Sequence, residues 1–138
     1  MFKKSTFLSL VNAYANSSPA LQVIQRSMNA LGEYVNSVYS MEYKMEILRF
    51  RLEPGDFREA VMEMDRTRRN AHEAAIDACR ILNRICEQAG IENFYTGNLA
   101  DRLEVADFCL EVVSTLFEDR VGVRKSLQDW VDAVEKMA

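Results

Sequence analysis

The residues best suited to chemistry lie in one stretch near the middle of the chain. Residues 65–73 read Asp-Arg-Thr-Arg-Arg-Asn-Ala-His-Glu and include the only histidine. Residues three and four positions apart are neighbours on a helix, so Asp65 would lie beside Arg68 and Arg69, and both arginines beside His72. Two interpretations follow. One is a hydrogen-bonded structural layer, and the other is a small polar site whose arginines hold an anion or carboxylate.

Several metal-binding and catalytic patterns are missing from the sequence. A di-iron bundle needs Glu-x-x-His on two helices, and this chain has one histidine with no glutamate three residues before it. The zinc-protease pattern His-Glu-x-x-His fails because position 76 is Ile76. One histidine and three cysteines show no zinc spacing, and no glycine loop for phosphate is present. We therefore expect neither a metal nor a cofactor.

One enzymatic alternative comes from a partial resemblance to the all-α nucleotide pyrophosphohydrolases. Members of that family hold magnesium with Glu-x-x-Glu on one helix and Glu-x-x-Asp on another. The segment Glu104-Val105-Ala106-Asp107 is similar to the second half of this motif. The first half would be Glu42 and Glu46, which stand four residues apart instead of three. This alternative assigns a magnesium site to Glu42, Glu46, Glu104 and Asp107.

Two long helices must position these residues. Apolar side chains recur in alternating steps of three and four residues before Pro54 and again after it, as in helices packed lengthwise. The first series is Leu21, Ile24, Met28, Leu31, Val35, Val38, Met45, Leu48 and Leu52, and the second is Phe57, Val61, Met64, Ala71, Ala75, Ala78, Leu82, Ile85 and Ala89. We predict an antiparallel hairpin of helices at about 19–53 and 56–89.

A turn at Pro54 also predicts which residues face each other. It pairs Leu31 with Ala78, and it places Glu42 opposite Arg68. These two charged residues interrupt the two apolar series at matching positions. We therefore predict a Glu42–Arg68 ion pair that fixes the register of the hairpin, with a neighbouring Asp65 or His72 joining it. In a dry layer, losing one partner would cost roughly 3–5 kcal/mol.

Three further helices are predicted around the hairpin: over residues 2–15, from Asn98 to about Arg120, and after Gly122. The predicted helix caps are Ser18, Asp56 and Asn98 at N-termini and Gly90 at a C-terminus. The residues of the last helix expected to point inward are Val123, Leu127, Trp130, Val131 and Val134. The fold class is therefore all-α, an antiparallel bundle of four to five helices in a single domain over residues 1–138.

The fourth helix carries apolar residues around more than half of its circumference, so we expect it to touch more than one neighbour. These neighbours belong to its own chain or to a second subunit, and the second case predicts a homodimer. Its acidic residues, Glu104, Asp107, Glu111 and Glu118, share one face that is expected to be solvated. The longest connection precedes this helix and contains Phe94 and Tyr95, which we expect to fold over the helix ends as a hydrophobic plug.

Composition excludes some classes of partner. The net charge of −4 argues against nucleic acid, and no segment is long and apolar enough to span a membrane. The N-terminus has the outline of a signal peptide, but Ser9 and Asn12 interrupt its short apolar region. The three cysteines are interpreted as reduced core thiols, which predicts a cytoplasmic protein.

The run from Asp65 to Ile76, with Leu82-Asn83-Arg84-Ile85 after it, resembles a family of small bacterial all-helical proteins without an assigned function. The resemblance covers about residues 20–120 and implies a bacterial source. It supplies no catalytic residues. We expect a non-enzymatic interaction or regulatory protein that forms a homo-oligomer or binds another protein.

Overall fold

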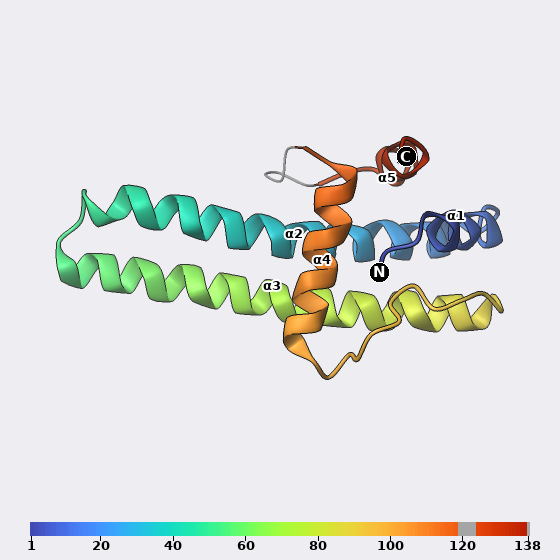
Figure 1. Ribbon diagram of the computed structural model, residues 1–138, viewed down its shortest axis with the longest axis horizontal. Helices are drawn as coiled ribbons and strands as arrows, with labels where there is room; N and C mark the ends of the chain where they lie inside the picture. Colours follow the sequence, from blue (N-terminus) through green and yellow to red (C-terminus); the bar gives the residue numbers. More distant parts are fainter. Residues whose placement is uncertain (119–123, 138) are drawn as a thin grey trace.

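The computed structural model describes residues 1–118 and 124–137, and all regular elements within these residues are helices. They are α1 (Lys4–Ala13), α2 (Ser18–Arg49), α3 (Pro54–Gln88), α4 (Arg102–Leu116) and α5 (Leu127–Glu135). Helices α2 and α3 run antiparallel and make most of the contacts between helices (Figure 1). The prediction of an all-α fold built on a long hairpin is confirmed.

Each helix of the hairpin starts slightly earlier than the sequence predicts. The Ser17 hydroxyl accepts the backbone N–H of Ala20 at 3.4 Å, so Ser17 is the N-cap of α2 and Ser18 is its first helical residue. Helix α3 starts at Pro54, because a proline ring fixes a helical φ and a first-turn residue needs no N–H partner. Asp56 therefore lies inside the first turn of α3 and does not cap it.

This earlier start changes which residues of the hairpin face each other. Helix α2 ends at Arg49, so the turn precedes Pro54 and is not centred on it. The ring of Tyr34 packs on the ring of His72, with 4.7 Å between the two ring centroids. The predicted register would instead place Val38 opposite His72. The register of the hairpin is therefore displaced by about one helical turn from the prediction.

The end of α3 is closed by backbone hydrogen bonds. Gly90 adopts a φ of 69°, a left-handed conformation that glycine enters without steric cost. This lets the N–H of Ile91 donate to the carbonyl of Cys86 at 3.0 Å, and the N–H of Gly90 to that of Glu87 at 3.1 Å. The pair of bonds is a Schellman motif, and the predicted cap at Gly90 is confirmed.

Helix α4 lies across the hairpin instead of along it, and it contacts α2, α3 and α5 (Figure 1). Its N-cap is Asp101, whose carboxylate accepts the N–H of Glu104 at 3.1 Å. The predicted cap, Asn98, instead accepts the N–H of Ala100 at 2.9 Å in the preceding turn. Helix α4 runs to Leu116, and the predicted end at Arg120 lies outside the described residues.

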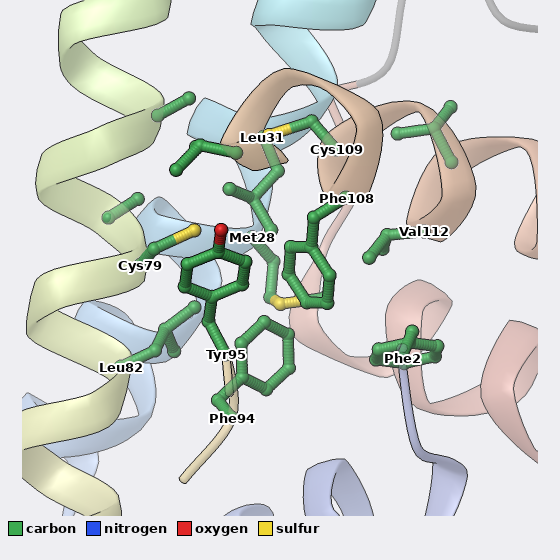
Figure 2. Packing of buried hydrophobic residues seen from close by; sticks show 14 of the residues in the cluster. Phe2, Met28, Leu31, Cys79, Leu82, Phe94, Tyr95, Phe108, Cys109 and Val112 are labelled. Carbon is green, nitrogen blue, oxygen red and sulfur yellow. The ribbon is translucent and has the colours of Figure 1, made fainter. Parts of the chain in front are cut away.

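The connection before α4 packs into the core. Phe94 and Tyr95 are each only 3% exposed, which confirms the predicted hydrophobic plug. Both rings pack beside the ring of Phe108 of α4, and Phe94 also meets the ring of Phe2 (Figure 2). Asn83 of α3 anchors the connection by exchanging two hydrogen bonds with the backbone of Tyr95, at 2.7 and 2.8 Å.

Helix α5 closes the core beside α1 and α2. Trp130 is fully buried, and its indole N–H donates to the side-chain oxygen of Asn29 at 2.8 Å. Val134 is also fully buried, whereas Leu127 and Val131 are half-buried. The remaining residue expected to point inward, Val123, lies outside the described residues, as does the predicted break at Gly122.

Candidate functional site

The charged residues around position 68 form an ion-pair cluster on one helix. The Asp65 carboxylate pairs with Arg68 at 2.8 Å and with Arg69 at 3.0 Å, as helical spacing predicts. The hydrogen bond from Arg68, with the charges of both arginines, lowers the pKa of Asp65 despite some desolvation. Because these groups satisfy one another, the cluster offers no unpaired arginine to a ligand at Arg68.

His72 belongs to the junction of three helices. It is 6% exposed and lies against Tyr34 of α2, and its Nε2 is 2.9 Å from the backbone carbonyl of Arg102 at the start of α4. A carbonyl only accepts, so Nε2 carries the proton in this bond. Burial lowers the pKa of His72, which keeps the imidazole neutral. The side chain therefore joins α2, α3 and α4.

The predicted Glu42–Arg68 ion pair is wrong. Glu42 is exposed, and none of the ion pairs within the described residues joins it to Arg68. The displaced register explains this, since Tyr34, and not Glu42, reaches the Arg68 region from α2. Of the predicted polar site, the structure brings together Asp65, Arg68 and Arg69 as ion pairs and places His72 one turn further along α3.

The four carboxylates of the alternative magnesium site are not assembled. Glu42 and Glu46 lie on the outer part of α2, beside Tyr39 and Arg49. Glu104 instead accepts the backbone N–H of Asn98 at 3.3 Å. Among the described residues, no group of three or more histidine, cysteine, aspartate or glutamate side chains is arranged to hold a metal ion. The described residues therefore give the pyrophosphohydrolase interpretation no metal centre.

The three cysteines are buried free thiols. Burial raises the pKa of Cys86. A hydrogen bond with Cys79, together with burial, raises the pKa of Cys109. Nucleophilic cysteines need the opposite shift, toward the thiolate. All three side chains therefore belong to the core, and Figure 2 shows Cys79 and Cys109 there.

The apolar arc of α4 is mostly covered by its own chain. The buried residues of this helix are Val105, Ala106, Phe108, Cys109, Val112 and Val113. Leu103, at 77% exposure, is the large apolar side chain of α4 that stays in solvent. The observation that suggested self-association through this helix is thus explained within one chain, while homodimerisation itself stays a prediction.

Four of the seven large apolar side chains that are exposed among the described residues lie elsewhere, on the outer part of the hairpin. We call residues 36–71 the arm. No residue of the arm is buried, although it makes up about a quarter of the chain, and Figure 1 shows it extending past α4 without another helix alongside. Tyr43, Phe50 and Met62 on the arm are 68%, 86% and 60% exposed. None of these three residues belongs to the two apolar series that predicted the hairpin.

A groove lies between the two helices at the base of the arm. It has a volume of about 610 Å³. Its lining residues are Glu33, Asn36, Ser37, Ser40, Met41, Lys44, Glu63, Met64, Thr67, Ala71 and Arg124. Its lining thus combines methionines and small hydroxyl residues with charges of both signs. Such a surface suits a side chain or helix of a partner better than a single charged ligand.

Comparisons with known proteins give a family and no activity. No curated protein and no solved structure matches the chain. No helix of the described residues combines the length and the apolar character needed to cross a membrane. A family model covers residues 3–122, which is most of the chain and includes both hairpin helices and α4. The chain therefore belongs to the family described as "Protein of unknown function (DUF3232)".

Proposed function

We propose that this protein is a non-enzymatic interaction or regulatory protein and that it binds its partner through the arm. The observation that carries this proposal is the absence of any buried residue from position 36 to position 71, in a segment where the large apolar side chains Tyr43, Phe50, Leu52 and Met62 are exposed. Helices in proteins gain most of their stability from packing of an apolar face. Contiguous exposed apolar surface usually marks a site of association. A partner would supply the packing that the chain itself does not.

The chemistry of the exposed surfaces supports binding over catalysis. The single imidazole, His72, is buried in a junction of helices and is not among the residues that line the groove. The groove combines Met41 and Met64 with serine and threonine hydroxyls. Methionine side chains adapt their shape to different apolar partners, so they are common on binding surfaces.

Hydrogen–deuterium exchange tests this proposal directly. In the isolated protein at sub-micromolar concentration, we expect backbone amides of residues 40–65 to exchange at least tenfold faster than those of residues 72–86. The latter residues carry the buried face of α3 and serve as the internal control. Equally slow exchange in both segments would mean that the arm is stable by itself and needs no partner.

We also propose a cytoplasmic location. Three free thiols in the core support a reducing compartment, because cysteines in oxidising compartments are commonly paired. A bacterial source stays a prediction that follows from the family resemblance.

A further inference from the structure

The arm is electrically neutral, whereas the whole chain carries a net charge of −4. It contains seven acidic and seven basic residues, so the surplus of acids lies entirely in the rest of the molecule. A surface with balanced charges does not repel a second copy of itself. This neutrality points toward self-association in preference to a strongly charged partner.

The charges of the arm are also separated along α3. The outer segment, residues 53–63, carries four acids and one arginine: Glu53, Asp56, Glu59, Glu63 and Arg58. The inner segment, residues 65–69, carries one acid and three arginines (Asp65, Arg66, Arg68 and Arg69) and so has a net charge of +2, although its arginines pair with Asp65 and Glu63 within α3. If two arms lay parallel, like segments would meet. If they lay antiparallel, the acidic segment of one copy would meet the basic segment of the other, twice, by two-fold symmetry.

The apolar features of the arm fit the same orientation. Phe50 lies at the tip of the arm and is 86% exposed. The groove with Met41 and Met64 lies at the opposite end, at the base. The part of α2 in the arm is about 20 Å long at 1.5 Å per residue. When two arms overlap fully in opposite directions, each tip therefore reaches the base of the other arm.

We propose that two copies of the chain pair arm on arm in antiparallel orientation, with Phe50 of each copy in the groove at the base of the other's arm. This names the partner for the surface in the proposed function and rests on that function. Two helices about 10 Å wide and 20–25 Å long give a projected face of roughly 400–500 Å². Side chains make this face ridged, so its accessible area is larger than its projected area. The accessible area therefore approaches the roughly 800 Å² per partner of a standard interface.

The first experiment measures mass in solution. Sedimentation or light scattering of the full chain at tens of micromolar should give a dimer. Phe50→Asp should weaken dimerisation at least tenfold, because a carboxylate would replace the ring in the groove. Leu103→Asp is the matched control, since Leu103 is 77% exposed on α4, outside the arm, and should leave the dimer intact. Fluorescence of Trp130, the single and buried tryptophan, verifies that each variant folds.

A second experiment measures orientation. The native thiols are buried, so a cysteine placed on the arm is the one that reacts with a short bis-maleimide. A mixture of Phe50→Cys and Ser37→Cys proteins should give a cross-linked heterodimer, because Ser37 lines the groove. Phe50→Cys alone should give no cross-linked dimer. Cross-linking of Phe50→Cys with itself would indicate tip-to-tip or parallel pairing and would overturn the proposal.

Exchange measured at several protein concentrations separates the two proposals. If amides of residues 40–65 become protected as the protein dimerises, both proposals are supported. If the protein stays monomeric and these amides stay unprotected, the second copy is excluded, while the arm remains a site for another partner. A monomer with a protected arm overturns both. A dimer that Leu103→Asp dissociates and Phe50→Asp does not would also overturn the arm-on-arm arrangement.

Discussion

The surroundings of His72 fix its protonation state. Its Nε2 donates to the Arg102 carbonyl, its ring lies against Tyr34, and Arg102 and Arg68 place positive charge nearby. The Asp65–Arg68–Arg69 cluster could be predicted from the sequence, because helical spacing alone brings these residues together. The contacts of His72 could not, since they come from α2 and α4. Asp65 is also partly exposed, so solvent screens its ion pair with Arg68 and losing Arg68 should change stability little.

The buried imidazole predicts a pH dependence of stability. Burial lowers the pKa of His72 below its ordinary value of 6.5, so the unfolded chain takes up this proton at a higher pH than the folded chain. Between the two pKa values the unfolded state binds more protons, and stability falls as the pH falls. We expect the melting temperature to decrease from pH 7.5 to pH 5.5, and to decrease less in His72→Gln, whose amide can still donate to the carbonyl.

The dependence of the melting temperature on pH can be assigned to His72 by comparing the wild-type protein with His72→Gln. His72 is the only histidine, and the pKa of Asp65 is lowered, so that carboxylate titrates below this pH range. Thermal melts followed by circular dichroism at matched ionic strength give the measurement. An equal slope in both proteins would show that the imidazole does not govern acid sensitivity in this range.

At the level of elements, the sequence predicts the helices better than their relative positions. The three- and four-residue repeat identifies α2 and α3, because an apolar stripe of this period and length is typical of a packed helix. It does not determine the register, since a shift by one helical turn keeps apolar residues facing each other. Treating Pro54 as the centre of the turn caused the error. Proline is favoured at the first helical position, where it starts α3.

The start of α4 gives a prediction at this scale. Asp101→Ala should destabilise the fold by about 1 kcal/mol, because its carboxylate accepts the N–H of Glu104 and lies at the positive end of the helix. Asn98→Ala should cost less, since Asn98 accepts a bond outside the helix. Urea unfolding followed by circular dichroism compares the two variants. A larger loss for Asn98→Ala would assign the cap to Asn98, the residue that the sequence pattern favours.

At the level of the whole molecule, the buried residues of the hairpin end where α4 crosses it. The buried residues of α2 end at Val35, and those of α3 begin at His72. The sequence could not predict this boundary, because it depends on the direction in which α4 crosses the hairpin. A helix of 15 residues spans only about 22 Å, so α4 covers the hairpin where it crosses and leaves the arm bare.

This distribution predicts that the core folds without the arm. Replacing residues 41–64 by a short glycine-containing turn should leave the melting temperature within about 8 °C of the full chain, which corresponds to roughly 1–2 kcal/mol. Trp130 is buried among core residues and should keep its emission maximum. The control deletes the same number of residues from the parts of α2 and α3 that carry their buried residues. This deletion should abolish folding. A red-shifted Trp130 in the arm-less chain would show that the arm supports the core.

Because α4 crosses the hairpin, the stability of the core and the length of the arm can change independently in evolution. The side chains under α4 fix how firmly the molecule holds together, while the residues beyond it fix only how far the tip stands from the rest. Seven residues added to each helix would move Phe50 outward by about 10 Å and turn it by roughly 20°. No side chain beneath α4 would change its neighbours. The length of the arm can therefore change in evolution without a change in the stability of the domain that carries it.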